Sequence, residues 1–257
     1  MGTIFSFHLD PGPSGTKAAS AAIAAACARL HELDAIFSTF KPNSPMSLLR
    51  TGLLGPVDAP GEMALVLELC ERARKLSRGW FDPWAMPGGL DPAGLVKGWA
   101  TEQALEILRL GGIEAAMVNG GGDIAVLGLP RDARTWRIGI RHPWRPKALA
   151  CVLEIEGAVA TSGCYERGPH LINPKNGRMV FQTASASVVG PSLAMCDALA
   201  TALVVAEDEG PDVARSLSGY ESYLIKSDGT EFATDGIVFT AADLELENKE
   251  PTVPGGL

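Results

Sequence analysis

One apolar helix constrains the fold more than any other part of this sequence. Residues 191–207, PSLAMCDALATALVVAE, begin with a proline and a serine and continue with Ala, Leu and Met, which favour helix. The segment is apolar on nearly every side, so the helix is expected to be buried on most of its faces. The other elements of the chain must therefore pack around it.

Two polar side chains interrupt this helix, and they share one face. Asp197 and Thr201 are four positions apart, which is about one helical turn. A buried carboxylate needs a partner, and two hard oxygen ligands one turn apart suit Mg2+ or Ca2+ better than zinc. The alternative is structural: Asp197 caps a loop, and the Thr201 hydroxyl bonds back to its own helix. Both interpretations stay open from this segment alone.

The remaining segments alternate between strand hairpins and separate long helices. Hydrophobic periodicity predicts helices at 17–37, 60–77, 98–112 and 211–217, and strands at 3–9, 115–119, 124–128, 136–140, 149–155, 158–161, 184–189 and 222–226. This order favours an α+β fold, with helices packed on antiparallel sheet, over a parallel doubly wound sheet.

The domain organisation is expected to be simple. We predict one domain over residues 1–257, with a frayed tail at about 247–257. Residues 80–95, WFDPWAMPGGLDPAGL, hold three prolines and three glycines and cannot be regular structure. A boundary could fall there, although no linker composition marks it.

Composition excludes several function classes. The formal net charge of −8 argues against binding to nucleic acid or to an anionic membrane. The five cysteines are scattered and include no CxxC, so neither a disulfide framework nor a zinc site is indicated. The N-terminus lacks the basic and apolar regions of a secretory signal, so a cytoplasmic protein with reduced thiols is expected.

Two glycine-containing turns could approach a ligand. The run 119–123, NGGGD, lies between two apolar strands, where glycines allow close backbone approach and supply amide donors to a phosphate. It is not a dinucleotide-binding GxGxxG, and an ordinary hairpin turn explains it equally well. The turn at Thr161-Ser162-Gly163 lacks GxSxG, so Ser162 is interpreted as a ligand hydrogen-bond donor or a turn residue rather than a nucleophile.

Two further residues are candidates for chemistry. His170 lies in a loop between a Gly-Pro turn and an Asn-Pro turn, where it could act as a general base or simply face solvent. Lys97 precedes Gly98 at the predicted start of a helix, where it could form an anion pocket with free backbone amides or be a solvated side chain.

Short motifs then follow one another along most of the chain. They are MGT at 1–3, STF at 38–40 with Ser44, FDP at 81–83, Asp91 with KGWA at 97–100, NGGGD at 119–123, TSG at 161–163 with Tyr165, His170 with Asn173-Pro174 and Gly177, and DALAT at 197–201. In this order the motifs resemble the ApbE family, the FAD:protein FMN transferases.

The resemblance implies a tunnelling-type α+β fold of two intimately packed subdomains with FAD in a cleft between them. It implies an enzyme that uses Mg2+ to cleave the FAD pyrophosphate and attaches FMN to a threonine or serine of a target flavoprotein, releasing AMP. By position, Asp197 and Thr201 would hold the metal with a backbone carbonyl of Gly94, and His170 would deprotonate the acceptor hydroxyl. The residues implied at the FAD site are Met1, Phe40, Trp80, Phe81, Asp82, Asp91, Lys97, Leu171 and, nearby, Asp123.

The sequence departs from the family pattern at several positions. The family commonly has Asp-Pro-x-Thr-Gly where this chain has NPKNG at 173–177, Tyr at the positions of Phe40 and Trp99, Asp at Glu102, and Asn at Arg50. Two alternatives to flavin transfer therefore stay open, an FAD pyrophosphatase that forms FMN and AMP and a flavin-binding protein without turnover.

Overall fold

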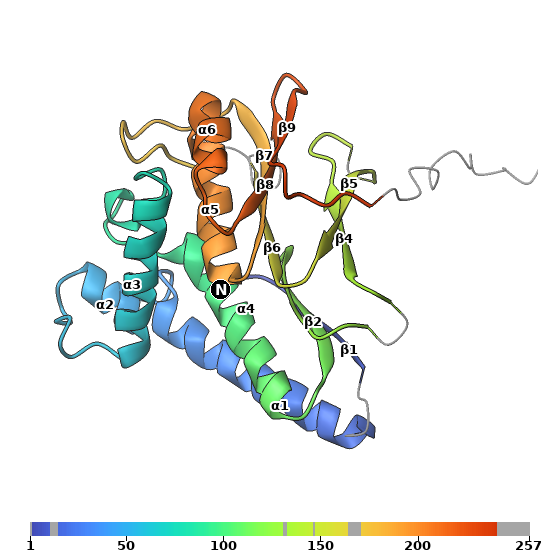
Figure 1. The fold of residues 1–257 in the computed structure, drawn as a ribbon. Coiled ribbons are helices and arrows are strands. Elements are labelled where there is room, and N and C mark those ends of the chain that lie inside the picture. The colour runs from blue at the N-terminus through green and yellow to red at the C-terminus, as the bar shows by residue number, and fades with distance from the viewer. Residues whose placement is uncertain (1, 11–14, 131–132, 146, 164–170, 241–257) are drawn as a thin grey trace, which may run out of the picture.

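The computed structural model describes residues 2–10, 15–130, 133–145, 147–163 and 171–240. Met1, His170 and the predicted frayed tail lie outside these ranges. Three layers make up the structure: a helical layer, a central sheet and a small two-stranded sheet on the opposite side (Figure 1).

The central sheet has seven strands in the order β1-β2-β3-β6-β7-β8-β9, and every neighbouring pair is antiparallel. Its strands are β1 (Phe5–Asp10), β2 (Ala115–Gly120), β3 (Asp123–Leu127), β6 (Ala158–Gly163), β7 (Thr183–Gly190), β8 (Glu221–Lys226) and β9 (Glu231–Ala233). The antiparallel α+β prediction is confirmed. The short strand β9 was not predicted, because its three residues include only one large apolar side chain.

The second sheet is the hairpin of β4 (Trp136–Arg141) and β5 (Leu149–Ile155). Its inner face carries Trp136, Ile138 and Leu153, which pack with Ile124 and Val159 of the central sheet into a small hydrophobic core. The β4–β5 hairpin therefore covers the face of the central sheet that the helices leave open.

The helical layer packs on the other face of the central sheet. It contains α1 (Gly15–Phe37), α2 (Pro45–Arg50), α3 (Gly61–Leu76), α4 (Ala93–Leu110), α5 (Leu193–Val205) and α6 (Gly210–Arg215), with one-turn 3-10 helices η2 (Pro83–Ala85) and η3 (Glu207–Glu209). The described helices are all too short or too polar to cross a membrane.

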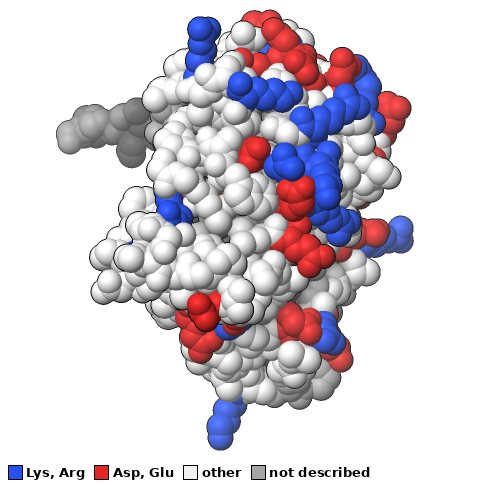
Figure 2. Space-filling model, turned by 90° about the vertical axis from the view of Figure 1, so that its left-hand side faces the viewer, with Lys and Arg blue, Asp and Glu red and all other residues white. Residues whose placement is uncertain are grey.

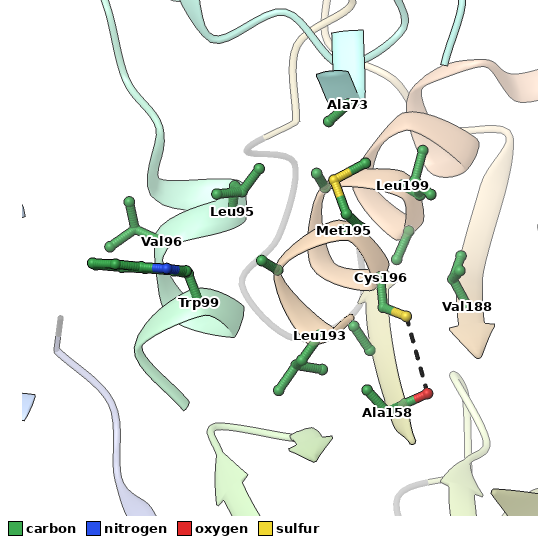
Figure 3. Close-up of a cluster of buried hydrophobic side chains, with 14 of the residues drawn as sticks. Ala73, Leu95, Val96, Trp99, Ala158, Val188, Leu193, Met195, Cys196 and Leu199 are labelled. Atoms are coloured by element: carbon green, nitrogen blue, oxygen red, sulfur yellow. Dashed lines mark hydrogen bonds between the residues drawn. The ribbon is translucent and has the colours of Figure 1, made fainter. Parts of the chain in front are cut away.

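Helix α5 is the centre of the larger hydrophobic core, as its composition predicted. Every residue of α5 is buried except Thr201, which is half-buried. Figure 3 shows α4 on one side of the helix and strands β6 and β7 on the other, with Leu95 pointing toward the helix from α4. The Sγ of Cys196 lies 4.0 Å from the carbonyl oxygen of Ala158, and burial raises the pKa of this thiol well above its usual range.

Helix α4 begins earlier than predicted. The Oδ1 of Asp91 accepts the amide of Ala93 at 3.1 Å, and the helix starts at Ala93 rather than near Gly98. Lys97 therefore lies inside the helix and not at its start, so the predicted pocket of free helical amides at Lys97 is wrong. The prolines and glycines of 80–95 obscured a helix start that Asp91 and Pro92 mark clearly.

Figure 2 shows the side of the molecule on which α2 and α3 lie. Acidic and basic side chains lie next to each other there, and a broad part of the face carries no charge. Arg74 and Lys75 of α3 each pair with Glu71, at 2.8 and 3.5 Å. On this face the basic side chains gather mainly at the upper right, with acidic side chains among them.

Candidate active site

A cavity of about 430 Å³ opens between the helical layer and the end of strand β6. Its volume lies within the range typical of small-molecule sites, roughly 300–1,000 Å³. The lining comes from several separate parts of the chain. They are residues 80–94 with the first turns of α4, the turn after β2, the end of β6, residues 171–172, and α5. The lining residues are Trp80, Phe81, Asp82, Pro83, Met86, Pro87, Asp91, Ala93, Gly94, Lys97, Gly121, Thr161, Ser162, Gly163, Leu171, Ile172, Asp197, Thr201 and Val205.

Most of the residues singled out in the sequence meet at this cavity. They are Trp80, Phe81, Asp82, Asp91, Gly94, Lys97, Leu171, Asp197 and Thr201. Asp123 lies directly behind the wall, where it contacts Lys97. His170 and Met1 lie outside the described residues, so their roles stay predictions.

Phe40 is the exception among the described residues. It lies three residues beyond the end of α1, in a turn, and its side chain is 96% exposed. It is not part of the cavity lining. Its predicted stacking on FAD would require the ligand to extend past the cavity, so this role also stays a prediction.

Three charged residues form a cluster at the inner wall, with Lys97 and Asp197 in the lining and Asp123 behind it. The ammonium of Lys97 in α4 contacts Oδ2 of Asp123 in β3 and lies 3.4 Å from Oδ1 of Asp197 in α5. Both carboxylates are buried, with Asp123 1% exposed and Asp197 6% exposed. Lys97 is therefore neither a solvated side chain nor a residue at the start of a helix. Its ammonium offsets the charge of two buried carboxylates, which would be unfavourable without a cation beside them.

Backbone amides fix the two carboxylates. The Oδ1 of Asp123 accepts the amide of Thr161 at 3.1 Å, which ties β3 to β6 next to the Thr161-Ser162-Gly163 lining. The Oδ2 of Asp197 accepts the amide of Gly98 at 3.1 Å, which ties α5 to α4. Within the described residues, the partners of Asp197 therefore include a helix amide and a lysine.

The loop at 80–92 is built by its own polar contacts. Asp82 accepts the amide of Trp84 at 3.0 Å, and the amide of Asp91 donates to the carbonyl of Pro83 at 2.9 Å. From α2, the guanidinium of Arg50 donates to the carbonyl of Gly88 at 3.0 Å and lies 3.7 Å from Oδ2 of Asp91. Sequence reasoning noted Arg50 only as a departure from the family pattern and missed that it holds a wall of the cavity.

The residues present fit a hard divalent cation. A Cβ built on Gly94 would lie 3.3 Å from the Phe81 ring and 3.6 Å from Oγ1 of Thr201, so Gly94 and the Thr201 hydroxyl are neighbours in the cavity that Asp197 also lines. The Asp197 carboxylate, the Thr201 hydroxyl and the backbone of Gly94 offer only oxygen atoms to a metal. The described residues contain no group of three His, Cys, Asp or Glu side chains that could hold a metal, so the set of protein ligands is sparse. A sparse oxygen set suits Mg2+, which takes its other ligands from water and phosphate.

Fold and site together define an α+β protein with an antiparallel sheet and a cavity lined by aromatic and charged side chains. A family model described as "ApbE family" matches residues 1–89 and 85–224. The chain therefore belongs to the ApbE family.

Curated relatives and solved structures are similar to the chain. Proteins named "FAD:protein FMN transferase" match at 36% identity over 155 residues in Rhodobacter capsulatus, covering 56% of this chain and 29% of the relative, and at 33% over 151 residues in Vibrio cholerae, covering 54% and 45%. The chain thus spans less than half the length of these relatives.

Solved structures share the fold over most of the chain. The structure titled "Flavin Transferase ApbE from Vibrio cholerae" aligns with a TM-score of 0.78 at 23% identity, covering 91% of this chain and 94% of that one. The ApbE protein of Thermotoga maritima aligns with a TM-score of 0.75 at 20% identity, covering 84% and 89%.

Proposed function

We propose that this chain is an FAD:protein FMN transferase that cleaves the pyrophosphate of FAD and attaches FMN to a Thr or Ser hydroxyl of an acceptor flavoprotein, releasing AMP. Membership of the ApbE family and the names of the relatives support the reaction. The observation that carries the proposal is the position of Lys97, held by Asp123 and Asp197 on the wall of a cavity that also presents Gly94 and Thr201.

The chain's own residues would bind and orient the dinucleotide. Phe81 and Trp80 line the cavity with flat aromatic surface on which a base or an isoalloxazine can stack. Lys97 would face the phosphates, and the turn at Gly121 and the strand end at Ser162 would offer donors to their oxygens. Closure of the wall around the pyrophosphate would limit the access of water.

Asp197, Thr201 and the carbonyl of Gly94 would hold Mg2+. When bound, Mg2+ would offset the charge that develops on the phosphates as the P–O bond to AMP breaks. The acceptor hydroxyl would form the new bond to the FMN phosphorus, and His170 would accept its proton, because a Thr or Ser hydroxyl is a weak nucleophile near neutral pH.

The direct test is incubation of the chain with FAD, Mg2+ and a candidate acceptor domain. The expected product is an acceptor that carries acid-stable flavin fluorescence and the mass of one FMN, together with AMP. Asp197→Ala should form neither product. Free FMN and AMP without labelled acceptor would contradict transfer and indicate an FAD pyrophosphatase. FAD binding without any cleavage would contradict both reactions and indicate a flavin-binding protein.

The proposed base has its own test. His170→Ala should reduce transfer while FAD still binds with similar affinity, because the base acts on the acceptor hydroxyl and not on the dinucleotide. Transfer at the wild-type rate in this variant would remove His170 from the reaction.

A further inference from the structure

A short turn next to the cavity carries a lysine that the proposed function does not use. Residues 171–180 fold back on themselves, with Ile172 bridged to Met179. Asn173 is buried, and its Oδ1 accepts the amide of Lys175 at 2.9 Å. Because Ile172 lines the cavity, this ordered turn brings Lys175 to its edge.

The ammonium of Lys175 lies over an aromatic ring that lines the cavity. Its Nζ is 3.4 Å from the centroid of the Trp80 ring, while the backbone of Lys175 stays at the exposed tip of the turn. Within the described part of the chain, Lys175 makes no salt bridge. A cation on a neutral ring is held more weakly than one paired with a carboxylate or phosphate, so this ammonium can exchange partners at low cost.

The cavity needs such a cation. Three carboxylates line it, those of Asp82, Asp91 and Asp197, and Lys97 is the only lining cation among the described residues. From outside the lining, Arg50 pairs with Asp91 at 3.7 Å and Arg74 with Asp82 at 4.0 Å. Lys97 already contacts Asp123 as well as Asp197. One ammonium thus faces two carboxylates at the inner wall, and a pyrophosphate entering there would meet repulsion unless further positive charge came with it or lay at the edge of the cavity.

We propose that Lys175 binds a phosphate of the dinucleotide by moving its ammonium from the Trp80 ring to the phosphate oxygens. The flexible four-carbon stem of lysine allows this movement while the turn itself stays in place. The same movement frees the Trp80 ring face for stacking by a base. The nature of the phosphate-bearing ligand rests on the function proposed above.

The test uses the full chain, with FAD and ADP as probes, because ADP carries the pyrophosphate without the flavin. Lys175→Met keeps the apolar stem and removes the charge, and Lys175→Arg keeps a charge. The matched control is Lys147→Met, since Lys147 is also exposed but lies in the loop of the β4–β5 hairpin. Affinities are measured by calorimetry at low and high KCl, and Trp fluorescence is recorded with Trp80→Phe as the reference for the Trp80 signal.

Lys175→Met should weaken the binding of both FAD and ADP about tenfold at low salt, the effect of losing one charge-assisted hydrogen bond. This difference from wild type should shrink as KCl is added, because a lost charge, unlike lost packing, depends on ionic strength. Lys175→Arg should recover part of the affinity, and Lys147→Met should bind like wild type. Ligand binding should change the Trp80 fluorescence of wild type more than that of Lys175→Met.

Unchanged FAD and ADP affinity in Lys175→Met would overturn the proposal, as would a loss of affinity that does not respond to salt or a loss of equal size in Lys147→Met. The proposed function fails separately: normal FAD binding by wild type without FMN transfer would contradict the reaction while leaving the role of Lys175 in binding intact. Failure of wild type to bind either probe would contradict both.

Discussion

The backbone amide of Gly98 donates a hydrogen bond to Oδ2 of Asp197 at 3.1 Å, across the contact between α4 and α5. The two helices approach closely at this point, since a Cβ on Gly98 would lie 2.4 Å from the carbonyl oxygen of Leu193. Glycine at position 98 therefore sets both the spacing of the helices and the position of Asp197 in the cavity.

Gly98→Ala should consequently disturb stability and site together. The added methyl group meets backbone atoms, which cannot turn away as a flexible side chain can, so the free energy of unfolding should fall by about 1–3 kcal/mol. Flavin transfer should fall more than the folded fraction does, because Asp197 moves with α5. Urea denaturation and transfer assays on the same preparation measure the two effects.

Gly61→Ala is the matched control for this substitution. Gly61 begins α3, and a Cβ built there meets no atom within 4 Å. The free energy of unfolding should stay the same or rise by about 0.4–1 kcal/mol. Equal losses in the two variants would show that the loss at position 98 does not come from crowding against α5.

The fold was largely predictable because its signals are local. Period-two and period-3.6 patterns, hairpin turns and the apolar composition of 193–205 are sufficient to predict antiparallel strands around a buried helix. The start of α4 was not predicted correctly because proline is common both in loops and at the first positions of helices. Residues 80–95 contain prolines of both kinds, and Pro92 is the one that precedes the helix.

The site was predictable only in part. Asp197 and Thr201 lie on one helix, so their spacing alone placed them together. The contacts of Lys97 with Asp123 and of Lys175 with Trp80 join segments that are far apart in the chain, and no local pattern encodes such pairs. The resemblance to the ApbE family placed Lys97 at the site and Asp123 near it, but it did not indicate the contact between Lys175 and Trp80.

Arg50 should act as a positioning residue for the 86–91 wall. Arg50→Ala removes two hydrogen bonds to the carbonyl of Gly88 and the ion pair with Asp91, so the loop loses the contacts that hold it against α2. The KM for FAD should rise roughly tenfold, which corresponds to about 1.4 kcal/mol. Arg50→Lys should recover part of this effect, since an ammonium keeps the charge but lacks the planar fork of donors.

The control for Arg50 is Arg109→Ala, which removes an exposed pair with Glu106 at the far end of α4. Steady-state kinetics with FAD as the varied substrate should show wild-type KM in this control. A KM that is unchanged in Arg50→Ala would exclude the positioning role.

Glu102 should make stability depend on pH. It extends from α4 to accept the amides of Leu193 and Ala194 at the start of α5, and burial raises its pKa above the usual value of about 4.5. The folded chain therefore holds this proton more tightly than the unfolded chain. The contribution of Glu102 to the free energy of unfolding should fall as pH rises from about 4.5 through the raised pKa and then level off.

Glu102→Gln keeps an oxygen acceptor for the amides but cannot ionise, so its stability relative to wild type should increase over the same pH window. Glu106→Gln on the same helix is the control, because the hydrogen bond from the Arg109 side chain lowers the pKa of Glu106, the opposite direction from Glu102. Urea denaturation from pH 4.5 to pH 8 measures both. A stability difference between wild type and Glu102→Gln that is flat with pH would contradict the raised pKa.

Substitutions at Asp197 and Thr201 should impair metal binding while the chain still folds. Asp197→Asn keeps an oxygen that can accept the Gly98 amide, so the fold should persist, while the loss of charge should reduce transfer by at least about a hundredfold.

Thr201→Val removes the one hydroxyl that α5 presents to the cavity and should raise the Mg2+ concentration for half-maximal activity about tenfold. Thr16→Val, at an exposed position in α1, should leave this Mg2+ concentration unchanged. Mg2+ titrations followed by transfer rate and by thermal shift test these expectations together. Wild-type Mg2+ dependence in both Asp197→Asn and Thr201→Val would contradict a metal site at Asp197 and Thr201.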